Sequence, residues 1–387
     1  MTTRMRRRQF LGTLAALAAS PAASVFAREA QSPRRLILIY LMGGNDGYNT
    51  VVPYTDKAYY AMRPSIAVAR DAVLRLDDRF GLHPMLDPLK PIWDSKELAI
   101  LQGIGLPEVH DQHYSDYERL VTGTGPDEYF ADGWASRALA PSMASRALDA
   151  VALDALDIRE GDAMGPFRGG RLRVINSPFP AELTATRDFA QATHLVTPSL
   201  ANKPLPAYSP LALQTRFADE PFGHGLRAAV ELAKSRPDLP VIHITLDALD
   251  GDRHHCFDTH WKQLEYHGDG LRRLGSGLAS LRAALIEAGL WDSTLVATYD
   301  EFGRSPRENK DRGTEHGWAS TQFVMGGRVN GGFYGRAPAL TNVHWIGGDR
   351  PVIDYRQLYT TVIESWWGGN AAGVFSQRFR PLPLLRT

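Results

Sequence analysis

The sequence predicts an α/β protein with a mostly parallel sheet flanked by helices on both faces. Short apolar runs alternate along the chain with segments of helical spacing. This alternation is typical of a parallel sheet whose connecting helices pack against its two faces. The composition, 44% hydrophobic and 22% charged residues, is that of a globular protein, and 387 residues are enough to bury a large core.

Five apolar runs bounded by turn residues are predicted to be buried strands. They are Arg35–Met42, Glu97–Gln102, Pro240–Leu246, Thr294–Thr298 and Thr321–Met325. Between the third and fourth runs, the leucine spacing from Leu271 to Ala288 indicates a helix. The segment Asp354–Trp367 is predicted to be a C-terminal helix that ends at two glycines.

The stretch from about residue 130 to residue 235 interrupts this pattern. It is rich in Ala, Pro and Arg and has weak periodicity, so we interpret it as a largely helical insertion or a cap over the site. Residues 28–387 are otherwise expected to form a single α/β domain. The glycines between residues 326 and 332 are expected to form a hairpin turn.

The first 27 residues have the pattern of an export signal. A run of arginines precedes the apolar, alanine-rich segment from Leu11 to Ala19, and small residues lead to Ala27. The letters R-R-x-F-L at residues 7–11 resemble a twin-arginine signal, whose pathway carries folded proteins. We therefore expect a periplasmic or secreted protein, and the alternative is an uncleaved basic helix. The apolar segment is too short to span a bilayer, so no transmembrane segment is expected in the mature chain.

Charge and cysteine content exclude several classes of function. The chain has 43 basic and 43 acidic residues, so nothing indicates a nucleic-acid partner. Cys256 is the only cysteine, which excludes an intramolecular disulfide. A redox enzyme has little support, because the sequence has no dinucleotide loop, haem motif or cysteine pair.

Acidic residues follow three of the predicted strands. Asp46 comes after the first strand, Asp258 after the third, and Asp300 and Glu301 directly after the fourth. Because the carboxyl ends of parallel strands meet at one edge of a sheet, these carboxylates are expected to converge. Clustered carboxylates repel unless a cation or a proton neutralises them, which predicts a divalent metal ion such as Zn, Ca, Mg or Mn. The alternative for each acid is that it caps a following helix.

Two histidines are expected to complete this site. His260 lies two residues after Asp258, so in an extended segment both side chains lie on one face and can bind one ion. His316 follows the acidic pair after a polar loop. Imidazole nitrogens together with carboxylate oxygens suit a divalent cation.

Three further residues are candidates for acting on a substrate. Ester hydrolysis uses either an activated hydroxyl or a metal-bound water, and Ser115 is the only hydroxyl at the start of the helix predicted after the second strand. Its alternative role is a helix cap. His113 is a candidate metal ligand or general acid. Arg304 either binds an anionic substrate oxygen or pairs with Glu301 or Glu308.

Several motifs together resemble the bacterial family known as domain of unknown function 1501. They are G-G-N-D-G at residues 43–47, F-G-L-H-P at 80–84, F-D-T-H at 257–260, E-F-G-R at 301–304 and G-T-E-H-G at 313–317. The resemblance extends from about Arg35 to Leu384. That family is grouped with the alkaline phosphatase and sulfatase superfamily, so the resemblance implies an alkaline-phosphatase-like fold and a bimetal site.

The resemblance also implies roles for individual residues. The implied metal ligands are Asp46, Asp258, His260, Asp300, Glu301 and His316. The chain departs from the pattern where Glu301 replaces a histidine, where Gln112 replaces a serine, and where Glu315 replaces an aspartate.

These observations predict an exported, metal-dependent hydrolase of phosphate or sulfate esters. Its substrate would be a small-molecule or polysaccharide ester, addressed by His113 and Arg304. The alternative is a non-catalytic periplasmic protein that keeps the phosphatase-like fold to bind a metal or a polysaccharide. The absence of the expected serine at Gln112 favours this alternative.

Overall fold

The computed structural model of the chain describes residues 33–110, 112–145, 149–153, 165–168, 174–176, 194–195, 211–247, 256–340 and 350–386. The predicted export signal, residues 1–27, lies outside these ranges. Within them, no helix has the length and apolar character needed to cross a membrane.

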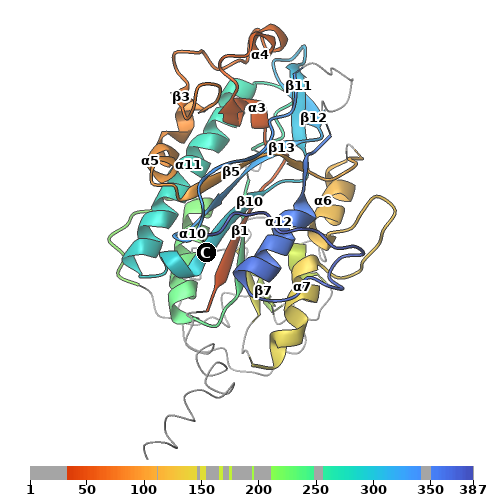
Figure 1. The fold of residues 1–387 in the computed structure, drawn as a ribbon. Helices are drawn as coiled ribbons and strands as arrows, with labels where there is room; N and C mark the ends of the chain where they lie inside the picture. The colour runs from red at the N-terminus through yellow and green to blue at the C-terminus, as the bar shows by residue number, and fades with distance from the viewer. Residues whose placement is uncertain are drawn as a thin grey trace, which may run out of the picture. The chain divides into compact units, whose positions relative to one another are not determined.

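A mixed, mostly parallel sheet of ten strands occupies the centre of the described chain (Figure 1). Its strands are β1 (Arg35–Leu41), β5 (Leu98–Gly105), β6 (Ala150–Leu153), β7 (Val174–Asn176), β8 (His194–Leu195), β9 (Val241–Leu246), β10 (Thr294–Tyr299), β13 (Ser320–Met325), β14 (Gly332–Gly335) and β15 (Ile353–Asp354). The strand order is β14-β5-β13-β10-β1-β9-β6-β7-β8, and β15 pairs with β5. Strand β13 is antiparallel to β10 and β5, and β8 is antiparallel to β7. The other pairings in this sheet are parallel.

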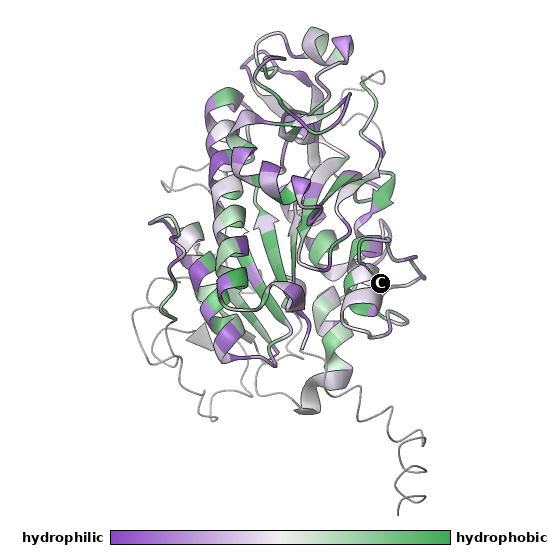
Figure 2. Cartoon of the chain, turned by 60° about the vertical axis from the view of Figure 1, so that its left-hand side comes forward, coloured by the Kyte–Doolittle hydropathy of each residue, from purple (hydrophilic) through white to green (hydrophobic). Residues whose placement is uncertain are grey.

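Helices cover both faces of this sheet. One face carries α5 (Lys90–Asp94), α10 (Pro221–Ser235), α11 (Gln263–Glu287) and the 3-10 helix η1 (Pro84–Leu89). The other face carries α6 (His113–Thr122), α7 (Trp134–Leu139), α12 (Tyr355–Thr360) and its continuation η6 (Thr361–Trp366). Figure 2 shows hydrophobic central strands between helices that also carry hydrophilic residues.

Strand β1 shows why a continuous apolar run forms a central strand. Ile37 and Ile39 pack into the core on one face, and Leu36 and Leu38 pack into the core on the other. Successive side chains of a strand point to opposite faces, so a strand covered on both sides must be apolar throughout.

The predicted fold class is confirmed. The five predicted strands are β1, β5, β9, β10 and β13, and the predicted helices are α11 and α12 with η6. The described parts of residues 130–235 contain α7, α10 and the 3-10 helices η2 (Ala140–Ser145) and η3 (Gly165–Phe167). They also supply β6, β7 and β8, which extend the sheet beyond β9. Whether this stretch caps the site stays a prediction.

The expected hairpin between residues 326 and 332 is wrong. Strands β13 and β14 do not pair with each other but lie on opposite sides of β5. The glycines therefore lie in a connection that crosses β5, which alternation of apolar runs alone cannot distinguish from a hairpin.

Smaller elements lie at the carboxyl ends of β1 and β10 and complete the candidate site (Figure 1). After β1 come α3 (Gly47–Thr50), α4 (Lys57–Met62) and a small antiparallel sheet of β2 (Val51–Val52), β3 (Leu74–Arg75) and β4 (Gly81–Leu82). At the amino end of β10, the 3-10 turn η5 (Trp291–Ser293) leads into the strand. After β10 come the antiparallel strands β11 (Gly303–Glu308) and β12 (Thr314–Gly317), which place Arg304 opposite His316.

Candidate metal centre

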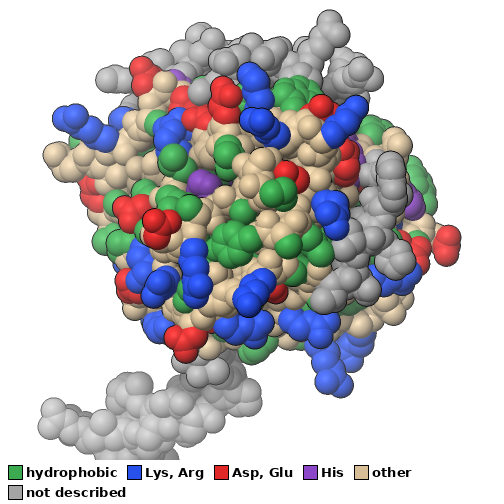
Figure 3. All heavy atoms as spheres, turned by 90° about the horizontal axis from the view of Figure 1, so that it is seen from above, with side chains coloured by type: hydrophobic (Ala, Val, Ile, Leu, Met, Phe, Trp, Pro, Cys, Tyr) green, Lys and Arg blue, Asp and Glu red, His purple; other side chains and the backbone are tan. Residues whose placement is uncertain are grey.

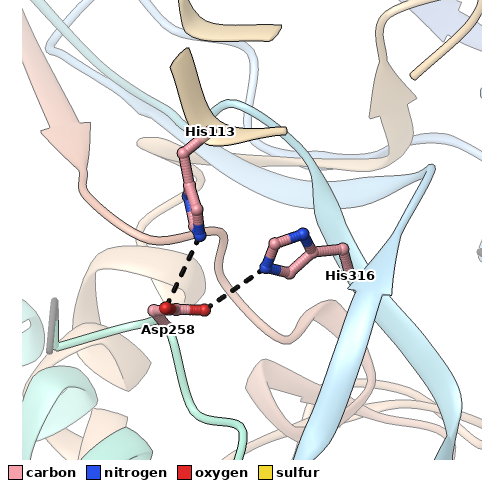
Figure 4. A group of neighbouring side chains, drawn as sticks. All are labelled: His113, Asp258 and His316. Atoms are coloured by element: carbon pink, nitrogen blue, oxygen red, sulfur yellow. Dashed lines mark ion pairs between the residues drawn. The ribbon is translucent and has the colours of Figure 1, made fainter. Parts of the chain in front are cut away.

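Three side chains from distant parts of the chain bring their potential ligand atoms together (Figure 4). The ligand atoms of His113, Asp258 and His316 all lie within 4.8 Å of one another. His113 is the first residue of α6, Asp258 precedes α11, and His316 lies on β12. His113 Nε2 is 3.5 Å from Asp258 Oδ2, and His316 Nε2 is 3.5 Å from Asp258 Oδ1.

A third histidine faces the same carboxylate. His260 Nε2 lies 3.1 Å from Asp258 Oδ1 and 3.1 Å from His316 Nε2. Three imidazole Nε2 atoms therefore surround one carboxylate. Their side chains are 34% (His113), 29% (His260) and 12% (His316) exposed, and that of Asp258 is 17% exposed, so solvent reaches the centre.

Two glutamates contact the Nδ1 atoms of two of these imidazoles, on the side of each ring away from Asp258. Glu301 Oε1 lies 2.7 Å from His113 Nδ1, and Glu315 Oε2 lies 3.0 Å from His260 Nδ1. A carboxylate on one ring nitrogen fixes the orientation of the ring and leaves the other nitrogen to face the centre. The sequence predicts Glu301 as a direct ligand, and Glu315 is there only a departure from the family pattern.

Glu301 is itself held by the protein. Its carboxylate is buried and accepts hydrogen bonds from the Gly43 backbone N–H at 3.1 Å and the Tyr40 hydroxyl at 3.0 Å. Tyr40 lies near the end of β1, with its side chain on the α6 side of the sheet. The alternation of side chains along the strand can be predicted from the sequence. The contact with Glu301 cannot, because it joins residues 261 positions apart.

The ionisation of the centre follows from these contacts. Burial opposes ionisation of Asp258, but hydrogen bonds from His113, His260 and His316 and the charge of Arg304 bring its pKa far below the usual range. Burial alone would lower the pKa of His113, but hydrogen bonds with Asp258 and Glu301 outweigh it and raise the pKa to about 9. The arrangement thus keeps Asp258 as a carboxylate and places cationic or metal-binding nitrogens around it.

Arg304 is engaged entirely within the protein. Its buried guanidinium donates to Asp258 Oδ1 at 2.5 Å, to the carbonyl of Gly44 at 2.9 Å and to that of Thr314 at 3.3 Å. It also donates to the carbonyl of Gly43. Arg304 therefore holds Asp258 in place, and it pairs with neither Glu301 nor Glu308.

Asp46 lies outside this group and serves as a helix cap. Its Oδ1 accepts the backbone N–H groups of Tyr48 and Asn49 at the start of α3. Its Oδ2 accepts from Arg63 Nη1 at 2.5 Å and from the Gln263 amide. Burial opposes ionisation of Asp46, but the charge of Arg63 outweighs it and lowers the pKa. Asp46 therefore has the helix-capping role that the sequence offers as the alternative to metal binding.

Asp300 also accepts hydrogen bonds from protein donors. Its carboxylate is buried and accepts from the Asn45 backbone N–H at 3.0 Å, the Ser320 hydroxyl at 2.6 Å and the Tyr355 hydroxyl at 2.9 Å. Burial, reinforced by the charge of Glu301, raises the pKa of Asp300 to about 7. Asp300 therefore fastens the loop after β1 to β13 and α12.

Ser115 lies in the first turn of α6 with its hydroxyl directed back along its own helix. Its Oγ donates to the carbonyl of Gln112 at 3.3 Å in an exposed position. Gln112 occupies the N-cap position of α6 without a side-chain capping bond. The described contacts of Ser115 are thus those of a residue that stabilises a helix end.

Comparisons with known proteins agree with the family resemblance. A family model described as "Protein of unknown function (DUF1501)" matches residues 211–364, a range that contains Asp258, His260, Asp300, Glu301, Arg304 and His316. No curated protein matches the chain.

Several solved structures are similar to the chain, all at low identity. The PsFucS1 sulfatase from Pseudoalteromonas sp. is 11% identical, with 95% of this chain and 73% of that chain covered and a TM-score of 0.41. The lipoteichoic acid synthase LtaP from Listeria monocytogenes is 12% identical, with 87% and 72% covered and a TM-score of 0.39. The C-terminal periplasmic domain of EptC from Escherichia coli, in complex with Zn, is 11% identical, with 77% and 73% covered and a TM-score of 0.39.

Proposed function

We propose that this protein, which is similar to the DUF1501 family over residues 211–364, is an exported, metal-dependent hydrolase of phosphate or sulfate esters, with its cation bound beside Asp258. One observation carries the proposal: three imidazole Nε2 atoms face the carboxylate of Asp258, and glutamates contact the other ring nitrogen of two of those imidazoles. Carboxylate–histidine pairs of this kind are typical of metal centres, where they fix the ring and raise its basicity.

The donor set fits a divalent cation that accepts nitrogen. Three imidazoles and one carboxylate correspond to the ligand types of zinc sites, and Zn²⁺ is therefore the cation we expect first. We infer one cation rather than two. The oxygens of Asp46 and Asp300, which the family resemblance implies as ligands, already accept hydrogen bonds from protein donors.

The residues of the centre then have separate tasks. A bound cation would supply a water of lowered pKa and would polarise the ester oxygen. Glu301 keeps His113 Nε2 directed at the centre, and Glu315 does the same for His260. Arg304 is a positioning residue, because its guanidinium joins Asp258 to the loop after β1.

A water is the nucleophile in this proposal, since the Ser115 hydroxyl is bound to its own helix start. His113, whose side chain is 34% exposed, can also contact the substrate at the edge of the centre. The small-molecule or polysaccharide nature of the ester and export through the twin-arginine pathway rest on the sequence.

The proposal is tested by a hydrolysis screen with aryl phosphate and aryl sulfate esters in the presence of Zn²⁺, Mn²⁺ or Ca²⁺. We expect turnover in the wild type and a loss of at least about a hundredfold in His316→Ala. His224→Ala is the matched control, because His224 lies on α10, pairs with the exposed Asp219 and should keep full activity.

A second candidate is a non-catalytic binding protein, favoured by Gln112 at the start of α6 where the family resemblance implies a hydroxyl. Failure to hydrolyse either ester class with any of these cations, in a protein that still binds a cation, would support this candidate instead.

A further inference from the structure

A cavity of about 660 Å³ is lined by none of the residues that form the candidate metal centre. Its lining residues come from α3, β2, the start of α4, β5, β13 and residues 336–340. Its volume is within the range of about 300–1,000 Å³ that is usual for small-molecule sites. Ala319, in its wall, is three residues from His316 along the chain.

The rim of this cavity is cationic. Lys57, Arg79 and Arg336 contribute three positive charges, and Asp56 contributes one negative charge. The Asp56 carboxylate is already used as the cap of α4, where it accepts the Ala58 N–H at 2.8 Å. Within the described part of the chain, none of the three cationic side chains forms a salt bridge.

Figure 3 looks onto the end of the protein where α3, α4 and β3 lie in Figure 1. Lysine and arginine side chains gather on the lower half of this face, around an apolar patch. Lys57, Arg79 and Arg336 are exposed, and exposed cations with no carboxylate partner attract anionic ligands.

Two buried polar side chains line the cavity and have no hydrogen-bond partner in the described chain. Gln102 is 4% exposed and Thr321 is 3% exposed, and both line the cavity. Neither side chain hydrogen-bonds to another residue of the described chain. Their polar atoms are not among the fully buried atoms of the described chain that lack a partner, so they open into the cavity and can hydrogen-bond to a ligand there.

We propose that this cavity binds a sulfated oligosaccharide, with sulfate groups at Lys57, Arg79 and Arg336 and sugar hydroxyls at Gln102 and Thr321. The guanidinium groups suit the planar, multidentate recognition of sulfate oxygens. Single-stranded nucleic acid fits less well, because it requires exposed ring faces for base stacking. The two aromatic rings of the cavity, Tyr48 and Phe80, are only 6% and 8% exposed.

The inference does not depend on catalysis, and it is tested in the His316→Ala background with chelator present. The probe is a heparin-derived hexasaccharide, with its desulfated counterpart as the chemical control, and binding is measured by calorimetry. We expect saturable binding of the sulfated probe alone. In Lys57→Ala/Arg336→Ala the affinity should fall at least about tenfold.

The matched control removes two exposed cations outside the cavity, in Arg378→Ala/Arg380→Ala. This variant has the same net charge as the first and should bind the sulfated probe within about twofold of the parent protein. Gln102→Leu, which keeps the side-chain size and every charge, should weaken binding at least about threefold through loss of the amide. Thermal melting checks that each variant is folded.

Three results would overturn the proposal. The first is an equal loss of affinity for the sulfated hexasaccharide in the two double variants. The second is equal affinity for the sulfated and desulfated probes. The third is tighter binding of a thymidine oligonucleotide than of the sulfated hexasaccharide. Competition by inorganic sulfate at the same concentration as the hexasaccharide would instead assign the cavity to a small inorganic anion and reject the saccharide.

Discussion

Glu301 Oε1 lies 2.7 Å from His113 Nδ1, although the two residues are 188 positions apart in the sequence. This contact explains the glutamate at a position where the family resemblance implies a histidine ligand. Glu301 is buried behind the centre and orients a histidine contributed by α6. The imidazole is therefore supplied by a different element, and the carboxylate takes the supporting role.

Glu301→Gln should weaken cation binding without unfolding the protein. The amide keeps the shape of the side chain but no longer fixes the His113 ring as a carboxylate does, so we expect about a 10- to 100-fold loss of Zn²⁺ affinity. Calorimetric titration with Zn²⁺ measures the loss. Glu231→Gln is the control, because Glu231 is an equally buried glutamate on α10. Similar affinities in the two variants would remove Glu301 from the centre.

The second glutamate–histidine pair should act on His260 alone. Glu315 is on β12 and its side chain is 52% exposed, so its effect should be smaller than that of Glu301. A double-mutant cycle with Glu315→Gln and His260→Ala should give a coupling free energy of about 0.5–1 kcal/mol in Zn²⁺ binding. Strict additivity of the two single variants would show that the contact at 3.0 Å does not orient His260.

The pair of Asp46 and Arg63 should contribute to stability rather than to cation binding. Both side chains are fully buried and their charged atoms are 2.5 Å apart. Asp46→Asn leaves the buried guanidinium without its charge partner, so the free energy of unfolding in urea should fall by about 3 kcal/mol.

Asp56→Asn serves as the control for this variant, because it alters an exposed cap and should cost about 1 kcal/mol or less. The cation content of folded Asp46→Asn should equal that of the wild type. Loss of the cation in this variant would restore Asp46 as a ligand.

The raised pKa of Asp300 predicts that the free energy of unfolding depends on pH. Its pKa of about 7 in the folded protein lies above the ordinary value of 3.8, so the folded state holds a proton that the unfolded chain has lost. The stability contributed by this proton is complete below pH 3.8 and is lost as the pH rises through about 7.

Asp300→Asn should therefore flatten the decline in unfolding free energy between pH 4 and pH 7, by at most about 1.4 kcal/mol per pH unit. Urea unfolding at several pH values measures both curves. Parallel curves for wild type and variant would show that Asp300 ionises normally.

The sequence is most informative where a strand is buried on both faces. Strands β1, β9 and β10 are short, mostly apolar runs without strict alternation, which is typical of strands buried on both faces in the centre of a sheet. Strands β6, β7 and β8 are two to four residues long, and such short runs carry too little periodic signal to be distinguished from loops.

The candidate site could be located from the sequence but its internal roles could not be assigned. Strand-end positions brought Asp258, His260 and His316 forward as ligands, and the structure brings them together. The same rule also selected Asp46 and Asp300, because a carboxylate at a strand end can bind a cation, cap a helix or accept protein hydrogen bonds equally well. In the structure these two carboxylates accept hydrogen bonds from buried partners, Arg63 and Tyr355, and their role as metal ligands stays a prediction.

Elemental analysis of the protein, purified without chelator after export in its native host, tests the central claim most directly. We expect about one divalent cation per chain in the wild type and in His224→Ala, and almost none in His113→Ala or His316→Ala. A wild-type content below about a tenth of a cation per chain, with no change in melting temperature on adding Zn²⁺, Mn²⁺ or Ca²⁺, would contradict a metal centre at Asp258.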